Sequence, residues 1–265
     1  MVATMGEDAM GATGPGAEPR PLADMREEAR RVVATAEQRG VAVRLFGGVG
    51  VAMRSPSAAR PELQRRYNDL DFGGLSRQRD QIAALFTALG YEADRSFNAL
   101  RGHQRMLFWD RLNDRQVDVV LDRLRMCHTL DFKDRLTVDA LTVPLAELLL
   151  FKLQIVEANQ KDIVDSITLL GDHPVGDRDG DCINAAHIAR LAADDWGLHH
   201  TLDLSLERVG RHATSLAVDL PFAIEDQIAC LRSRMEEERK SARWKMRARL
   251  GERMKWYELP EEVRG

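Results

Sequence analysis

The chain has 265 residues, of which 44% are apolar and 30% are charged, the balance of a globular protein rather than a disordered one. Its 38 Lys and Arg against 42 Asp and Glu leave a formal net charge of −4, which excludes a global basic field for nucleic acid, so any phosphate-binding surface must be local. Three well-separated cysteines, Cys127, Cys182 and Cys230, exclude a disulfide framework and a zinc ribbon and favour a reducing, cytoplasmic setting.

The first 22 residues have the composition of a flexible tail. They carry acids where a signal peptide needs positive charge, and they lack an apolar core. The longest apolar stretch of the whole chain, around PLAELLLF, is far shorter than the roughly 20 residues that a membrane span requires. We therefore expect a cytoplasmic protein with a tail over residues 1–22 and no membrane partner.

Residues 23–143 combine helical and strand patterns. Asp24 and Glu27 are placed to cap a helix that ends at Gly40, and the strand VAVRLF then runs to a Gly-Gly pair. A second short strand, RYNDLDFG, precedes a helix that Ser76 can cap. Three further strand-like runs follow, YEADRS, QRMLFWDRL and QVDVVLDRL. This order predicts a compact domain of the α+β class, a mixed β-sheet flanked by helices.

Residues 144–265 have a helical pattern. LAELLLFKLQIVEAN and KDIVDSITLL are the first two predicted helices, and further helices follow from Ile183. The C-terminal part predicts one long helix, whose segment from Arg239 to Lys255 carries eight Lys or Arg and a single acid, Glu252. We expect a helical C-terminal domain that ends in this long basic helix, which is either a solvated amphipathic helix or a surface for a phosphate backbone.

Two acids on the second strand, Asp69 and Asp71, are candidates for metal binding. Residues two apart on a strand leave the same face, about 6.5 to 7 Å apart along the strand. Carboxylates this close repel each other unless a cation lies between them, and Mg²⁺ or Mn²⁺ is a usual cation for oxygen ligands. QVDVVLD supplies a third carboxylate, Asp118, with Asp122 in reserve. Three such acids could hold two metal ions about 3.5 to 4 Å apart.

The Gly-Gly pair, Gly47 and Gly48, is a candidate phosphate site. It ends a strand and opens a short helix, VGVAMR, so its N–H groups can approach a polyphosphate with no Cβ in the way. Taken separately, a Gly-Gly pair is usually only a turn, and Asp-Leu-Asp is usually a solvated strand end. The combination in this order, followed by a strand with a third acid, favours a phosphate and metal site over these two alternatives.

This ordered set resembles the signature of the nucleotidyltransferase superfamily, which is typified by the DNA polymerase beta fold. The signature is a Gly-Gly or Gly-Ser turn, an Asp-hydrophobic-Asp strand and a third acid on a neighbouring strand. The matching positions here are Gly47 and Gly48, Asp69 and Asp71, and Asp118. The resemblance covers roughly residues 40 to 125, and it implies a nucleotidyltransferase-like mixed sheet with catalytic, metal-binding acids.

Two details of this region bear on nucleotide binding. Arg66 matches the R-x-x-D-h-D variant of the superfamily, which implies a nucleotide-binding role for it. Gly48 stands where the superfamily often has Ser, so a side-chain contact to phosphate is lost and backbone donors remain. Altered nucleotide binding and a catalytically dead descendant are both open consequences of that glycine.

A second resemblance covers the first two predicted helices of the helical half. VPLAELLLFKL and KDIVDSITLL resemble the C-terminal motif of AbiEii-type nucleotidyltransferases, a Lys on one helix and R/K-D-x-x-D on the next. The resemblance implies that Lys152 contacts the triphosphate and that Asp162 and Asp165 orient it or assist the acceptor. A lysine in an apolar helix must reach water or an anion, and a phosphate pocket would supply the anion. The alternative is that Lys152 reaches solvent and that Lys161 and Asp165 form a surface pair.

The two resemblances together imply metal-dependent nucleotidyl transfer. The donor would be a nucleoside triphosphate, ATP included, with Mg²⁺ or Mn²⁺ on the three acids, and the acceptor would carry a hydroxyl group. The AbiEii resemblance implies an RNA acceptor such as tRNA and a cognate antitoxin as partner. Two alternatives stay open: a small hydroxylated acceptor of the aminoglycoside or lincosamide type, and a non-catalytic module that binds a nucleotide or a partner.

Overall fold

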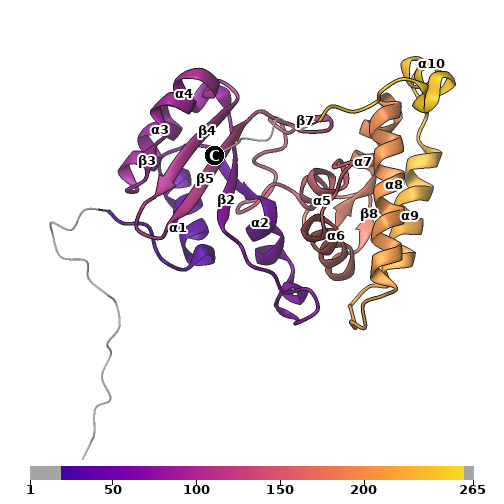
Figure 1. Ribbon diagram of the computed structural model, residues 1–265, viewed down its shortest axis with the longest axis horizontal. Helices are drawn as coiled ribbons and strands as arrows, with labels where there is room; N and C mark the ends of the chain where they lie inside the picture. Colours follow the sequence, from indigo (N-terminus) through magenta and orange to yellow (C-terminus); the bar gives the residue numbers. More distant parts are fainter. Residues whose placement is uncertain (1–18, 260–265) are drawn as a thin grey trace, which may run out of the picture.

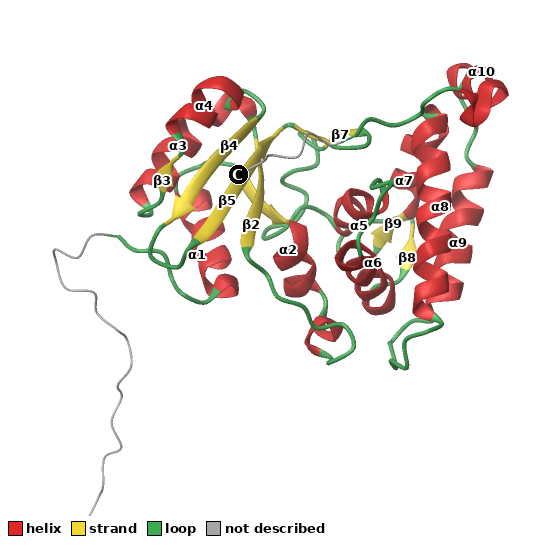
Figure 2. Cartoon of the chain, in the orientation of Figure 1, coloured by secondary structure: helices red, strands yellow, loops and turns green. Residues whose placement is uncertain are grey.

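The computed structural model describes residues 19–259. Of the expected tail over residues 1–22, residues 1–18 lie outside the described residues. The described chain forms two halves that lie side by side, a sheet with its helices and a group of helices (Figures 1 and 2). The first helix of the second half begins at Leu145, next to the predicted change of pattern at residue 144.

Within residues 19–259, a five-stranded mixed sheet forms the centre of the first half. Its strands are β1 (Val43–Phe46), β2 (Asp69–Gly74), β3 (Glu92–Ala93), β4 (Arg105–Asp110) and β5 (Arg115–Leu121). They lie in the order β1-β2-β5-β4-β3. β2 and β5 run parallel, and the other neighbours run antiparallel. The predicted combination of helices and a mixed sheet is confirmed in this half.

The helices of this half pack around the sheet. They are α1 (Met25–Gln38), α2 (Gly47–Arg54), α3 (Arg79–Ala88) and α4 (Arg95–Arg101). Asp24 caps α1 as predicted, because its carboxylate accepts two N–H groups of the first turn. Ser76 starts a 3₁₀ turn before α3, and its side chain makes no cap. The strand prediction for YEADRS is wrong beyond the two residues of β3, because Asp94 caps α4 through the N–H of Phe97.

The two faces of the sheet differ in chemistry. The apolar residues of β2 and β5 share one buried core with the helices: Leu70, Phe72, Val117, Val119 and Leu121 on the strands, and Ala29, Val32, Val33 and Ala36 on α1. Burying a large side chain of this kind contributes about 1.5 to 3 kcal/mol, so the apolar set fixes which face of each strand points inward. The alternating residues, among them Asp69, Asp71 and Asp118, therefore leave the opposite face.

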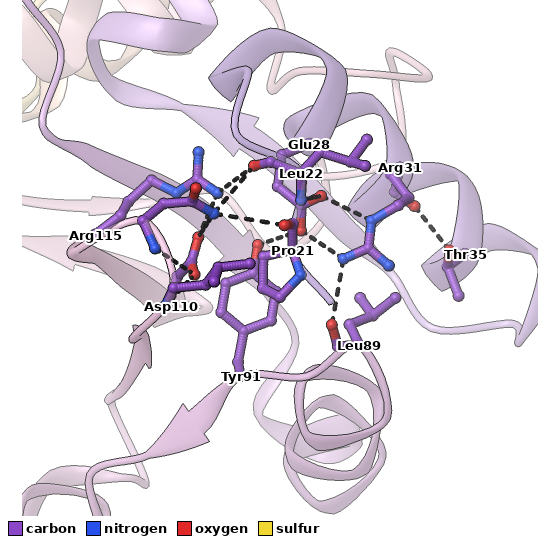
Figure 3. A network of polar contacts seen from close by, with 11 residues as sticks. Pro21, Leu22, Glu28, Arg31, Thr35, Leu89, Tyr91, Asp110 and Arg115 are labelled. Carbon is purple, nitrogen blue, oxygen red and sulfur yellow. Dashed lines mark hydrogen bonds and ion pairs between the residues drawn. The ribbon is translucent and has the colours of Figure 1, made fainter. Parts of the chain in front are cut away.

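A buried polar network joins α1 to the sheet at Asp110 and Arg115 (Figure 3). Glu28 of α1 is fully buried and accepts hydrogen bonds from the Tyr91 hydroxyl, the Arg31 guanidinium and the N–H of Leu22. Arg115, the first residue of β5, donates to the carbonyl of Leu22 at 2.8 Å. The charges are paired within the network, so its role is to hold the segment before α1 onto the sheet.

The second half is built of helices. They are α5 (Leu145–Leu153), α6 (Gln160–Asp172), α7 (Ala185–Asp194), α8 (Trp196–Ala213), α9 (Ile224–Glu237) and α10 (Ala242–Leu250). Two short strand pairs lie outside the main sheet: β6 (Arg123–Arg125) with β7 (Thr129–Asp131), before α5, and β8 (Val175–Gly176) with β9 (Ile183–Asn184), between α6 and α7. Every residue of α5 except Lys152 is buried, which places this helix at the centre of the second core. No helix in the described range has the length and apolar character needed to cross a bilayer.

The prediction of one long C-terminal helix is wrong. α9 ends at Glu237, and α10 begins after Ser241, whose hydroxyl accepts the N–H of Trp244. A serine that bonds the backbone in this way favours a helix start over a helix interior. The basic run from Arg239 to Lys255 therefore lies on α10 and on the segments on either side of it.

Candidate active site

The three predicted acids lie on two neighbouring parallel strands. Asp71 of β2 is the register partner of Asp118 of β5. Asp69 precedes Asp71 by two residues, so the three carboxylates leave the same face of the sheet. Asp69 is exposed, Asp71 is half-buried and Asp118 is buried. The sheet thus brings the three acids together next to the second half.

Asp118 has a hydrogen-bond partner on each carboxylate oxygen. Arg105 of β4 donates from Nε to Oδ1 at 2.6 Å, and Gln116 donates from Nε2 to Oδ2 at 2.6 Å. Asp122, the predicted reserve, is used elsewhere, since its carboxylate accepts the N–H of Ser76 at 2.9 Å. Among residues 19–259, no group of three or more His, Cys, Asp or Glu side chains is arranged to hold a metal ion. The third carboxylate is engaged by protein donors instead.

Asp71 has the surroundings of a carboxylate that needs a cation. Burial raises its pKa to about 7, and the charges of Asp69 and Asp118 act in the same direction. No donor within the described part of the chain hydrogen-bonds to its carboxylate. The carboxylate lies directly against Gly47, since a Cβ at position 47 would lie 2.0 Å from Asp71 Oδ2. A carboxylate under repulsion from two neighbouring acids suits a divalent cation as its partner.

The glycine turn lies directly against these acids. β1 ends at Phe46, whose register partner on β2 is Asp71. The chain enters α2 at Gly47 with a φ of +64°, a left-handed conformation that suits glycine. No side chain caps this end of α2, so its first N–H groups are available to an anion. Backbone donors and the Asp71 carboxylate therefore lie side by side.

The space beside Gly48 is filled by the side chain of Arg65. A Cβ at position 48 would lie 1.7 Å from Arg65 Nη2. Arg65 in turn makes two parallel hydrogen bonds to Asp165 of α6, each 2.8 Å long. The sequence prediction named Arg66, which is exposed and, within the described range, pairs with no acid. No local sequence signal distinguishes the two adjacent arginines. In the structure, Arg65 and not Arg66 packs against Gly48.

α5 and α6 place a cluster of charges beside the turn. Lys152 Nζ lies 3.1 Å from Asp162 Oδ1 and 3.0 Å from Asp165 Oδ2. Burial lowers the pKa of Lys152, but the carboxylates of Asp165 and Asp162 outweigh it, so the net pKa is raised. The alternative surface pair of Lys161 with Asp165 is wrong, because Asp165 is buried and bonds to Lys152 and Arg65.

A cavity of about 610 Å³ joins these groups where the two halves meet. Its charged lining comprises Asp71, Asp118, Asp162, Glu258, Arg101, Arg105, Arg125 and Lys152. Its apolar lining includes Phe46, Phe97, Leu124, Phe151 and Ile155, and Gly47 also lines it. The cavity therefore has both charged and apolar lining and can receive a ligand that carries both charged and apolar groups. Arg105 was not predicted, because its place at the acids follows from the β4–β5 pairing and not from any local motif.

No protein-family model matches the chain, and no curated protein matches it in sequence. Among solved structures, the antibiotic-resistance factor ANT(2'')-Ia in solution aligns with a TM-score of 0.36 and 13% identity, over 53% of this chain and 79% of that chain. The lincosamide antibiotic adenylyltransferase LnuA with bound lincomycin aligns with a TM-score of 0.38 and 15% identity, over 54% and 94%. ANT(2'')-Ia in complex with adenylyl-2''-tobramycin aligns with a TM-score of 0.31 and 13% identity, over 79% and 97%. At these scores the likenesses define neither the fold nor the function of this chain.

Proposed function

We propose that the chain is a metal-dependent nucleotidyltransferase, which moves a nucleoside monophosphate from a nucleoside triphosphate to a hydroxyl acceptor. The observation that carries the proposal is the pairing of Asp71 with Asp118 on parallel strands, directly beside the turn at Gly47. This chemistry needs carboxylates that bind a divalent cation and, next to them, donors that bind phosphate. Asp71, Asp118 and Gly47 line the same cavity, which supports the proposal.

The sheet half supplies the acids and the backbone donors. Asp69, Asp71 and Asp118 would hold Mg²⁺ or Mn²⁺, which when bound neutralises charge on the transferred phosphate and on the leaving group. The N–H groups that follow Gly47 and Gly48 would hold the triphosphate, because the start of α2 is uncapped.

The helical half supplies the side-chain cation. Lys152 reaches the cavity lining and is assigned to the triphosphate. Asp162 and Asp165 hold Lys152 in place, and Asp165 also holds Arg65. The nucleotide-binding role predicted for Arg66 is better assigned to Arg65, which lies against Gly48.

The proposed reaction is an in-line displacement at the α-phosphorus. A bond forms from the acceptor oxygen to the α-phosphorus as the bond to the bridging oxygen breaks, and pyrophosphate leaves. The proton of the acceptor hydroxyl passes to one of the site carboxylates. The protein contributes mainly position and charge, as is usual in phosphoryl chemistry.

An RNA such as tRNA is the first candidate acceptor. A hollow lined by Trp196, Trp244, Trp256 and Arg247 supports it, and Glu258 lines both this hollow and the cavity. The Arg247 guanidinium lies 4.7 Å from the centre of the Trp196 ring. Half-buried rings beside an arginine can still stack with unpaired bases, and the remaining basic side chains of α10 extend the surface.

A small hydroxylated molecule of the aminoglycoside or lincosamide type is the second candidate acceptor, and the cavity itself favours it. Its volume of about 610 Å³ falls within the range of small-molecule sites, roughly 300 to 1,000 Å³. Phe97, Phe151 and Ile155 provide an apolar wall for a compact acceptor. Such an acceptor would need no contact with α10, so replacing the exposed Arg243 and Arg249 with Gln should impair transfer to RNA and spare transfer to a small molecule.

An RNA acceptor would also support a role as the toxin of a toxin–antitoxin pair. Expression of the chain in bacteria should then arrest growth, and a cognate antitoxin should restore it. Expression of the Asp69→Asn, Asp71→Asn double variant should leave bacterial growth unchanged.

The test of the proposed function is label transfer. The chain is incubated with each nucleoside triphosphate labelled at the α-phosphate, with Mg²⁺ or Mn²⁺, and with total tRNA or a panel of aminoglycosides and lincosamides. The Asp69→Asn, Asp71→Asn double variant should lose at least about 100-fold in transfer. Asp122→Asn is the matched control, since it changes an acid that caps a turn outside the site. Transfer that survives the double variant would contradict the proposal, and absence of both transfer and metal-dependent nucleotide binding would favour a non-catalytic module.

A further inference from the structure

Arg105 stands where a bound cation would neutralise Asp118. Its Nε lies 2.6 Å from Asp118 Oδ1, and the Asp118 side chain is 3% exposed whereas that of Arg105 is 36% exposed. The carboxylate of this ion pair is therefore shielded from solvent, whereas the guanidinium is partly exposed. Arg105 can swing away from Asp118 without disturbing the β4–β5 pairing, because the backbone register involves other atoms.

A metal ion at Asp118 would compete with Arg105 for the negative charge of one carboxylate. Gln116 donates to the second oxygen of Asp118 at 2.6 Å, and Asp71 is the register partner of Asp118, so a cation held by both acids would lie close to both donors. A divalent cation repels the charged guanidinium and leaves the neutral amide almost unaffected. Arg105 is therefore the donor that leaves.

The displaced guanidinium stays in the cavity. Arg105 lines the cavity together with Lys152, and its Cζ lies 5.9 Å from the centre of the Phe97 ring. A planar guanidinium that has lost a carboxylate is suited to the oxygens of a phosphate. A triphosphate bound between Gly47 and Lys152 would bring such oxygens into the same space.

We infer that Arg105 is an internal counter-ion, which a metal ion displaces from Asp118 and which then binds the phosphates of the nucleotide. The inference rests on the proposed function, because it needs a metal ion at the acids. Its consequence is a coupling of the two ligands: metal alone competes with Arg105, whereas metal with nucleotide gives Arg105 a new partner. Coupling of this kind is reciprocal, so nucleotide also raises the affinity for metal.

The first test measures Mn²⁺ binding without nucleotide, by the electron paramagnetic resonance signal of free Mn²⁺. Arg105→Gln should bind Mn²⁺ about tenfold more tightly than the wild type, because a charge-assisted hydrogen bond no longer opposes the metal. Arg105→Lys keeps the charge but loses the planar guanidinium, so its affinity for Mn²⁺ should lie between those of the wild type and Arg105→Gln. Arg125→Gln is the matched control, as it removes the same charge from the cavity lining and should change the affinity by less than about twofold.

The second test asks whether the effect runs through Asp118. In the Asp118→Asn background, Arg105→Gln should change Mn²⁺ affinity no more than Arg125→Gln does, which is a double-mutant cycle on the ion pair. Binding of nucleotide with Mn²⁺ should show the opposite sign, since Arg105→Gln removes a phosphate ligand and should weaken it by about tenfold. Thermal unfolding of each variant confirms that it is folded.

The outcomes separate the inference from the proposed function. Unchanged or weaker Mn²⁺ binding by Arg105→Gln, with normal binding by the wild type, overturns the inference and leaves the metal site standing. Tighter binding that persists in the Asp118→Asn background also overturns the inference, because the effect of Arg105 would then not act through Asp118. Absence of Mn²⁺ binding in the wild type and in every variant refutes the metal site itself, and the inference with it.

Discussion

At the scale of single residues, Gly47 is required both for its backbone conformation and for the space beside it. Gly47→Ala should lose at least about 100-fold in transfer, because the new Cβ would lie 2.0 Å from Asp71 Oδ2. Gly40→Ala is the matched control: Gly40 has a φ of +67°, close to the +64° of Gly47, and nothing lies within 4 Å of its Cβ position. Both variants should lose about 1 kcal/mol of unfolding free energy to left-handed strain, measured in urea. Equal activity of the two variants would contradict the site.

Gly48 gives a second prediction at this scale, and it opposes the expectation from the resembled family. Serine is common at this position of the superfamily turn, but here a Cβ would lie 1.7 Å from Arg65 Nη2. Gly48→Ser should therefore weaken nucleotide binding about tenfold, because it pushes Arg65 off Asp165. In an Arg65→Ala background the added serine should have a much smaller effect on the dissociation constant. Tighter nucleotide binding by the Gly48→Ser single variant would show that Arg65 is not placed by this glycine.

The residues that sequence reasoning found and missed differ in how far their partners lie along the chain. Asp69 and Asp71 are two apart on one strand, so the strand period alone puts them on one face. Asp118 was predicted because it lies within an apolar strand-like run, and that strand is the neighbour of β2 in the sheet. Arg65 pairs with an acid one hundred residues later, and Arg105 reaches Asp118 through strand pairing. No local pattern specifies contacts of that kind.

At the scale of elements, the junction of α5 and α6 depends on one carboxylate. Asp165 is 4% exposed and balances both Lys152 and Arg65. Asp165→Asn should cost about 3 kcal/mol of unfolding free energy, because Arg65 loses its carboxylate partner and Lys152 keeps only Asp162. Glu207→Gln is the control, as it breaks an exposed pair with Arg211 and should cost less than about 0.5 kcal/mol in the same urea titration. A loss of similar size in both variants would mean that the junction does not rely on this ion cluster.

Element boundaries were predicted correctly where one sequence signal dominated. Their prediction failed where two signals competed. α5 is apolar throughout, so its position was plain in the sequence. YEADRS contains both strand-forming residues and Asp94, and the cap decided in favour of α4. The basic C-terminal run has helix-forming residues throughout, but Ser241 interrupts it by bonding the backbone of Trp244. Capping residues inside a helical pattern are the signal to weigh more heavily.

At the scale of the whole molecule, the site is a product of the packing between the two halves. The first half supplies Asp71, Asp118 and Gly47, and the second supplies Lys152 and Phe151. The sequence of each half could indicate the site residues of that half. The cavity between the halves depends on how they pack against each other. The sequence could therefore indicate the chemistry of the site, whereas the shape that selects an acceptor follows from tertiary packing.

The stability of the whole chain should fall in acid because of histidines in the interior. Burial lowers the pKa of His128, His173 and His199 below the usual value of about 6.5. As the pH falls below that value the unfolded chain binds protons that the folded chain does not, so the free energy of unfolding decreases from about pH 7 towards pH 5. Asp71 acts in the opposite direction, because its raised pKa, about 7, lets the folded chain bind a proton that the unfolded chain releases.

Because these terms oppose each other, the pH dependence of the wild type alone does not isolate the histidines. The difference between the wild type and His128→Gln does, since every other group is shared and the lost hydrogen bond to Thr201 contributes equally at all pH values. The wild type should lose more unfolding free energy than His128→Gln between pH 7 and pH 5, measured by urea denaturation at each pH. Replacing the exposed His103 with Gln should leave the pH dependence of the wild type unchanged. Parallel curves for the wild type and His128→Gln would mean that His128 binds its proton as readily in the folded chain as in the unfolded one, and burial would then not be what sets its pKa.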